Sequence, residues 1–285
     1  MPIQWFPGHM AKARREVQEK LKLVDFVIEL VDARAPFASE NPMLKQILNQ
    51  KPKMRVLMKK DLADPKVTHA FIDHFNSLGE RAISVDVNRK EDIKKVVETA
   101  KLMAHDKMER MRKKGIKPRP ARAMIIGIPN VGKSTLINRL ANKKIAKTGD
   151  RPGVTTSQQW IKVKKDFELL DTPGILWPKF EDEVIGYRLA CLGTIKDQIL
   201  HMDDLAVFLL RYLQDHYPNV LMERYQIEDI NQDIIPLFDH IGRLRGAIAP
   251  GNTVDYDKTA ELIIRDYRSG KLGLISLERP EDASH

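Results

Sequence analysis

An α/β fold with a mainly parallel sheet, followed by a small all-helical domain, is predicted for this chain of 285 residues. Strand-like and helix-like patterns alternate up to Pro178, as in parallel strands that are joined by helices. The segment Ala123–Gly127 is apolar throughout, which is typical of a strand buried on both faces. After Pro178 only helical spacing recurs. We therefore expect one domain over residues 1–178 and a second over residues 179–285.

The first half of the chain divides into elements by hydrophobic period and by proline. Met10–Leu23 has apolar residues at helical spacing and should form an amphipathic helix. Val24–Asp32, rich in β-branched and aromatic residues, should be a strand that ends before Pro36. The elements that follow are expected as a strand at 54–58, a helix at 66–78, a strand at 81–85 and a long helix from about residue 91 to the prolines at 118 and 120.

The second half continues this alternation and then loses it. The strand at 123–127 leads into a helix at 134–140, and strands at 158–163 and 167–170 follow. The C-terminal part shows helical spacing at 205–213, 233–244 and 258–268, and none of its segments has the alternation of a strand. This change of pattern is the reason for a domain boundary near Pro178.

The composition is that of a globular protein from a reducing compartment. Hydrophobic residues make up 42% of the chain, which is enough for packed cores. Cys191 is the single cysteine, so an internal disulfide is excluded. No apolar run approaches the roughly 18–20 residues that span a bilayer, and the N-terminus lacks the basic and apolar regions of a signal peptide. We therefore expect a cytoplasmic protein without a membrane span.

Positive charge is in excess and unevenly placed. The net charge is +9, and Lys107–Arg122 holds eight basic residues and one acidic residue. A second basic group comprises Lys143, Lys144, Lys147 and Arg151. Such clusters favour contact with a nucleic acid, while a solvated surface without a partner is the alternative.

The segment Gly127-Ile-Pro-Asn-Val-Gly-Lys-Ser134 matches the phosphate-binding loop pattern GxxxxGK[ST], between a predicted strand and a predicted helix. Its glycines allow backbone N–H groups to close around phosphate oxygens. Lys133 is expected to neutralise the β- and γ-phosphates, and the Ser134 hydroxyl to bind Mg²⁺. The other expected nucleotide contacts in this segment and just after it are Asn130, Val131, Gly132 and Thr135.

A second phosphate motif, of the type DxxG, follows at Asp171-Thr-Pro-Gly174, at the end of a predicted strand. Asp171 would hold Mg²⁺ through a water molecule, and the Gly174 N–H would contact the γ-phosphate. Between the two motifs, one threonine should complete the Mg²⁺ shell and order its loop when a triphosphate is bound. Thr155 is the expected residue, and Thr156 is the alternative.

The residues that read the base are expected upstream, at Met58-Lys59-Lys60-Asp61, because nothing after Gly174 fits the pattern N/TKxD. The Asp61 carboxylate would accept hydrogen bonds from guanine N1–H and the 2-amino group, donors that adenine lacks. Lys59 would lay its alkyl stem over the base. Met58 stands where the pattern has Asn, so an NTPase with relaxed base choice is the alternative.

A companion loop that contacts the base is expected where the third strand meets the long helix. Asp86 and Val87 are its expected residues, and a register that starts at Ser84 is the alternative. The base-reading half of the site thus precedes the phosphate-binding half, which reverses the usual order. This order indicates a circularly permuted Ras-like P-loop GTPase domain.

The chain resembles the circularly permuted GTPases, and among them the ribosome biogenesis GTPase A (YlqF) family, over nearly its whole length. The shared features are the permuted order, Trp5-Phe-Pro-Gly-His-Met10, Asp32-Ala-Arg-Ala-Pro36 and Arg245-Gly-Ala-Ile-Ala-Pro-Gly-Asn252. The resemblance implies a permuted Ras-like domain with a helical C-terminal domain, GTP hydrolysis, and late assembly of the bacterial large ribosomal subunit.

The same resemblance implies contact with ribosomal RNA, which the basic clusters also favour. The expected contacts are the segment Lys107–Arg122 and the C-terminal domain. A GTP-dependent switch that acts through a protein partner, without RNA, is the alternative.

The residue after DxxG cannot orient the attacking water, because Ile175 has no side-chain group that hydrogen-bonds. His9, expected in a non-helical arm, is the candidate for that role, and Asn130 is a candidate ligand for K⁺ near the phosphates. The alternatives are an ordinary loop cap for Asn130 and a packing or surface histidine for His9. Hydrolysis is therefore expected to be slow in the free protein and stimulated by the large subunit.

Overall fold

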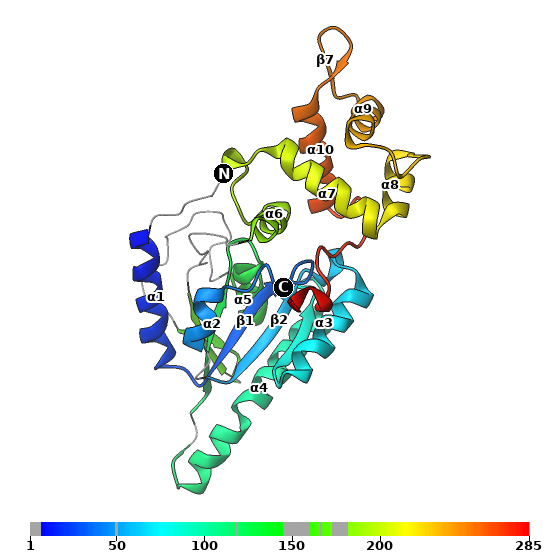
Figure 1. Ribbon diagram of the computed structural model, residues 1–285. Helices are drawn as coiled ribbons and strands as arrows, with labels where there is room; N and C mark the ends of the chain where they lie inside the picture. Colours follow the sequence, from blue (N-terminus) through cyan, green and yellow to red (C-terminus); the bar gives the residue numbers. More distant parts are fainter. Residues whose placement is uncertain are drawn as a thin grey trace. The chain divides into compact units, whose positions relative to one another are not determined.

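Figure 1 shows a computed structural model that describes residues 7–48, 51–117, 119–144, 160–165, 167–172 and 182–284. The chain divides into two compact units. The first comprises Met1–Glu181 together with Glu278–His285, and the second comprises Asp182–Leu277. The sequence-based boundary at residue 178 lies outside the described residues. The segment 278–285, which the sequence analysis assigns to the second domain, belongs to the first unit.

The first unit is built on a six-stranded sheet in the order β3-β2-β1-β4-β6-β5. Adjacent strands are parallel, except that β5 runs antiparallel to β6. The mainly parallel α/β sheet expected from the sequence is confirmed. The strands are β1 (Phe26–Asp32), β2 (Lys53–Met58), β3 (Arg81–Val85), β4 (Ala121–Gly127), β5 (Trp160–Val163) and β6 (Phe167–Asp171).

The helices of the first unit follow the expected order, with two differences. They are α1 (Pro7–Leu21), α2 (Pro42–Leu48), α3 (Pro65–Ser77), α4 (Lys90–Lys113) and α5 (Lys133–Ala141). Helix α2 is not predicted from the sequence, because its seven residues are too few for a helical period to show. The expectation that His9 lies outside a helix is wrong. Helix α1 begins at Pro7, because proline fits the first helical position, where no N–H donor is needed.

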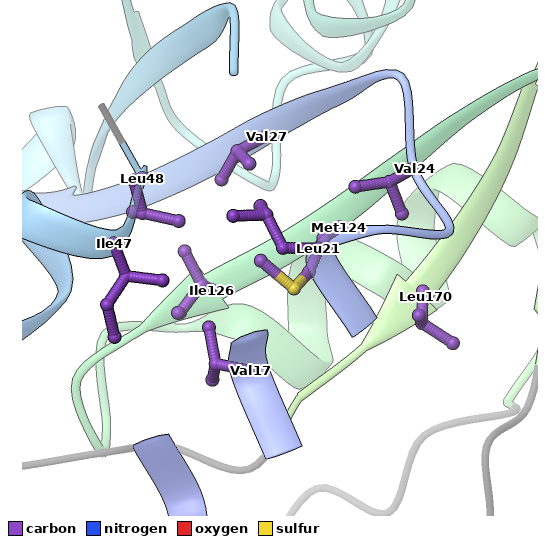
Figure 2. Close-up of a cluster of buried hydrophobic side chains, with 9 residues drawn as sticks. All are labelled: Val17, Leu21, Val24, Val27, Ile47, Leu48, Met124, Ile126 and Leu170. Atoms are coloured by element: carbon purple, nitrogen blue, oxygen red, sulfur yellow. The ribbon is translucent and has the colours of Figure 1, made fainter. Parts of the chain in front are cut away.

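One hydrophobic cluster joins α1 to the sheet, as Figure 2 shows. Val17 and Leu21 of α1 pack with Met124 and Ile126 of β4 and with Leu170 of β6. The remaining members are Val24, Val27, Ile47 and Leu48. This cluster therefore holds α1 against the sheet, and it includes Leu170, the residue directly before Asp171.

Asp25 fastens the end of α4 and the chain after it to the sheet. Its side chain, only 2% exposed, accepts hydrogen bonds from Lys107 Nζ, from Arg119 at 2.8 and 3.0 Å, and from the Arg122 N–H at 2.8 Å. Burial alone would raise the pKa of Asp25, but hydrogen bonds from Arg119, Lys107 and Arg122 outweigh it and lower the pKa to about 2.

Asp25→Asn should lower the free energy of unfolding by about 2 kcal/mol at neutral pH. This is the free energy that corresponds to the lowering of the Asp25 pKa to about 2. Because the pKa of Asp25 is lower in the folded state, its carboxylate stabilises the fold fully above about pH 4. This contribution to the free energy of unfolding is lost as the pH falls toward 2. Urea denaturation at several pH values should show the difference between parent and variant shrinking in acid. Asp106→Asn, at an exposed site on α4, is the matched control. A difference that stays constant with pH would contradict the assignment.

The second unit is mainly helical, and a buried carboxylate links two of its helices. Asp266 of α10 accepts hydrogen bonds from Arg224 Nε at 2.9 Å and from the Tyr225 hydroxyl at 3.2 Å, so it ties α8 to α10. The helices are α6 (Glu183–Cys191), α7 (Met202–His216), α8 (Pro218–Tyr225), α9 (Ile234–Leu244) and α10 (Tyr256–Arg268). Two strands of two residues each, β7 (Ile248–Ala249) and β8 (Thr253–Val254), form a small hairpin that the sequence analysis does not expect.

The chain returns to the first unit at Glu278, which is fully buried. The two carboxylate oxygens of Glu278 accept hydrogen bonds from the N–H groups of Phe37 and Ala38, at 2.7 and 2.8 Å. A short 3₁₀ helix, Pro280–Ser284, follows and lies against α3. Residues 278–284 are therefore a structural part of the sheet domain, and Glu278 binds the loop that follows β1.

Candidate functional site

The parallel strands bring the separate motifs to one edge of the sheet. The strands β1, β2, β3, β4 and β6 run in the same direction, so the segments that follow them meet at their carboxyl ends. The chain proceeds from β1 outward to β3 and then returns to the other side of β1 with β4. Ligands of doubly wound sheets bind at such a reversal. The permuted order in the sequence therefore does not separate the motifs in space.

The phosphate-binding loop connects β4 to the N-terminus of α5. A Cβ on Gly127 would lie 2.9 Å from Val131 Cγ1 and 3.1 Å from Leu30 Cβ, so only glycine fits this turn. Gly132 has a φ of 102° and caps α5, a conformation that L side chains rarely adopt. Lys133, Ser134 and Thr135 then form the first turn of α5, where free N–H groups and the helix dipole favour an anion.

Lys133 pairs with the start of the second phosphate motif. Its Nζ hydrogen-bonds to the Asp171 carboxylate and to the main-chain oxygen of Thr172. Burial lowers the pKa of Lys133, although the charge and hydrogen bond of Asp171 oppose this effect. The ammonium group thus lies between the two motifs that the sequence assigns to the phosphates.

The loop Met58–Asp61, which is expected to read the base and is called the base-reading loop below, is bound to the phosphate-binding loop by Lys59. Its Nζ donates to the main-chain oxygen of Asn130 at 2.7 Å and lies 3.5 Å from the Asp32 carboxylate. Lys59 itself has a φ of 59°, which starts the 3₁₀ turn Lys60–Leu62. Asp61 lies in this turn with an exposed side chain, as a residue that binds a ligand base requires.

Met58 stands where the pattern N/TKxD has Asn, so an apolar contact takes the place of a polar one. The side chain is 1% exposed at the end of β2, and its Cε lies 3.2 Å from the position that a Cβ on Gly132 would take. Met58 therefore packs directly against the backbone of the phosphate-binding loop. The base-reading loop keeps its attachment to that loop through this packing and through Lys59.

Lys59 lies beside a buried ion pair between Asp32 and Arg34. Asp32, 1% exposed at the end of β1, accepts two hydrogen bonds of 2.9 Å from the Arg34 guanidinium and one of 3.0 Å from the Arg34 N–H. Burial would raise the pKa of Asp32, but the charge and hydrogen bonds of Arg34 outweigh it and lower the pKa. The charged form of Asp32 is therefore favoured, and it lies 3.5 Å from the Lys59 ammonium group.

Asp92, which the sequence analysis misses, joins the two loops expected to contact the base. Its carboxylate oxygens lie 2.8 and 2.6 Å from Lys60 Nζ, and it accepts a hydrogen bond from the Asp86 N–H at 2.9 Å. The available signal was its place in the first turn of a helix that begins directly after the companion loop. Asp86 and Val87 lie in that loop, between β3 and α4.

The residues present fit a Mg²⁺ ion. Among the described residues no three acidic, histidine or cysteine side chains converge, so this part of the chain holds no complete metal cage. Mg²⁺ at a nucleotide is usually bound by one or two protein oxygens together with phosphates and waters. The Ser134 hydroxyl and the Asp171 carboxylate, at the ends of α5 and β6, supply oxygens of this kind. Thr155, Thr156, Gly174 and Ile175 lie outside the described residues.

The site has a glycine-rich loop at a helix N-terminus, an aspartate at the end of β6, and the loop Met58–Asp61 bound to the glycine-rich loop. Together these features define a P-loop GTPase. Residues 122–239 match the family model described as 50S ribosome-binding GTPase.

Similarity to known proteins extends over the full length. The chain is 57% identical over 282 residues to ribosome biogenesis GTPase A of Bacillus cereus, with 99% of this chain and 95% of that protein covered. It is 31% identical over 280 residues to the protein of that name from Thermotoga maritima, with 98% and 95% covered. The chain therefore belongs to the ribosome biogenesis GTPase A family.

The solved structures agree with this assignment. GDP-bound YlqF matches with a TM-score of 0.68 at 27% identity, over 94% of this chain and 100% of that one. GNP-bound YlqF from T. maritima matches with a TM-score of 0.66 at 27% identity, over 95% and 99%. The expected fold class and GTPase activity are confirmed. The protein binds guanine nucleotides, hydrolyses GTP and takes part in ribosome biogenesis.

Proposed function

We propose that the protein acts in late maturation of the bacterial large ribosomal subunit, binds its ribosomal RNA, and works in the cytoplasm. The observation that carries this proposal is an exposed basic end on α4. In Figure 1 the C-terminal half of α4 extends past the strands of the sheet. Of the described helices, none is both long and apolar enough to cross a bilayer.

Only half of the basic segment is free for a partner. Lys107 and Arg119 pair with Asp25, Arg112 pairs with Glu109, and Arg122 pairs with Glu168. The basic tip, as we define it, consists of the exposed residues Arg110, Lys113, Lys114 and Lys117. Within the part of the chain that the structure describes, these four residues form no ion pair. Their charges suit the phosphates of an RNA backbone.

Replacing all four residues of the basic tip with Gln should weaken RNA binding and flatten its salt dependence. Each phosphate contact contributes about 0.9 to the slope of log K against log salt on a duplex, so the slope should fall by about 3 to 4. The matched control replaces four exposed basic residues elsewhere in the first unit with Gln, namely Lys66, Arg81, Lys94 and Lys95. Binding of large-subunit RNA fragments across a salt series measures both effects.

The second measurement is cosedimentation with large-subunit precursors while GTP is held unhydrolysed. The parent and the control variant should sediment with the particles, and the basic-tip variant should not. A salt response that is flat for the parent, or equal sedimentation of both variants, would favour a switch that acts through a protein partner alone.

We also propose that the subunit stimulates hydrolysis, with His9 orienting the attacking water and K⁺ bound at Asn130. Phosphoryl transfer depends on positioning and charge stabilisation more than on base strength, so a histidine supplied by α1 suits the role. Mg²⁺ would neutralise charge on the phosphates.

His9→Ala should retain GTP affinity and lose most of the stimulated turnover, measured as phosphate release. Turnover at the parent rate would refute the His9 role. An equal rate in K⁺ and Na⁺ would refute the Asn130 role.

A further inference from the structure

Lys20, at the end of α1, is a lysine inside the nucleotide-binding unit that no motif accounts for. It is only 8% exposed, although its neighbour Lys22 is exposed. Removing an ammonium group from water is costly unless it finds a partner. The partner of Lys20 is the main-chain oxygen of Asp171, which lies 3.5 Å from Nζ.

The position of Lys20 follows from the core of the sheet domain. Val17 and Leu21, on the same face of α1, pack against Ile126 and Leu170 in the cluster of Figure 2. Leu170 directly precedes Asp171 on β6. The same packing that docks α1 therefore directs Lys20 at the start of the second phosphate motif.

Two ammonium groups converge on Asp171 in different ways. Lys133 binds the carboxylate, whereas Lys20 binds the main-chain oxygen. The two charges are close enough that Lys20, after the larger effect of burial, contributes to a lowered pKa of Lys133. If phosphates took the place of Asp171 at Lys133, the carboxylate of Asp171 would be available to hold Mg²⁺. The contact of Lys20 uses another atom of Asp171 and is compatible with that change.

We propose that Lys20 is a positioning residue for GTP hydrolysis, which holds the main chain of Asp171 and adds positive charge beside Lys133. Residues that orient the ligands of a metal commonly change metal affinity or activity by about 10- to 100-fold when they are replaced. Lys20 also makes the placement of Asp171 depend on the docking of α1. The inference rests on the GTPase site and does not require RNA binding.

The test compares Lys20→Met, Lys20→Arg and the exposed control Lys22→Met. Lys20→Met keeps an unbranched side chain that suits the buried site and removes the charge and the hydrogen bond. We expect its kcat to fall about 10-fold, with little change in KM for GTP, and the Mg²⁺ concentration for half-maximal activity to rise. Lys20→Arg should recover most of the rate, and Lys22→Met should match the parent.

A measurement without turnover separates this role from a structural one. Dissociation of fluorescent GDP should be slowed by Mg²⁺ less strongly in Lys20→Met than in the parent, while the melting temperature of the nucleotide-free protein stays close to that of the parent. Parent values of kcat and of the Mg²⁺ effect in Lys20→Met would overturn the proposal. Loss of activity that follows a lower melting temperature and is not recovered by Lys20→Arg would also overturn it.

Discussion

Asp61→Asn is expected to transfer the preference of the protein from guanine to xanthine nucleotides. The carboxylate would accept two hydrogen bonds from guanine, and hydrogen bonds to a charged group are about twice as strong as neutral ones. Affinity for GDP should therefore fall by a factor on the order of 10². Xanthine carries an oxygen in place of the 2-amino group, and the Asn amide can donate to it. Asp61 is exposed in its 3₁₀ turn, so the fold should be unaffected.

Titration of parent and variant with labelled GDP, XDP and ADP measures this transfer. Asp73→Asn, which makes the same chemical change on an exposed face of α3, is the matched control and should bind as the parent does. Equal affinity of the parent for GDP and ADP would show that base choice is relaxed. Unchanged GDP affinity in Asp61→Asn would show that Asp61 does not read the base.

Arg34→Met is expected to destabilise the protein by about 3 kcal/mol, because it leaves the Asp32 carboxylate buried without its main partner. Lys59 is the next cation, with its Nζ 3.5 Å from Asp32. We expect Lys59 to move toward Asp32 and to weaken its hydrogen bond to Asn130. The base-reading loop would then lose a link to the phosphate-binding loop, and GDP affinity should fall together with stability.

The double variant Asp32→Asn with Arg34→Met tests this explanation. Removing the charge as well as its partner should recover part of the free energy of unfolding, because a buried unpaired charge costs more than a buried neutral pair. Urea denaturation and GDP titration measure the two effects. If the double variant is no more stable than Arg34→Met, the loss does not come from the uncompensated charge of Asp32.

Local patterns in the sequence were sufficient for the central strands and the phosphate-binding loop. The strands β1 and β4 are mostly apolar because nearly all of their side chains are buried. Gly127 and Gly132 are required by a close approach and a positive φ. The helices α2, α6 and α8 were missed, since each is short and depends on its packing more than on its own period.

The parts of the site that the sequence did not reveal are contacts between distant segments. Asp92 reaches Lys60 across the sheet edge, and Lys20 reaches Asp171 from another helix. The place of Asp92 in the first turn of α4 was a signal for its contact, whereas the contact of Lys20 has none in the residues around it. Met58 departs from the family pattern, and only the structure shows that its side chain packs on Gly132.

The bond of Glu278 to Phe37 and Ala38 makes the helical unit an insertion within the sheet domain and not an extension of its end. A protein truncated after residue 181 would therefore lack Glu278, a buried carboxylate of the sheet domain, and would leave the N–H groups of Phe37 and Ala38 without their acceptor. A protein in which a flexible linker joins residue 181 to residue 278 keeps this contact, at the modest entropic cost of closing one loop. The second design is the minimal GTPase domain for this chain.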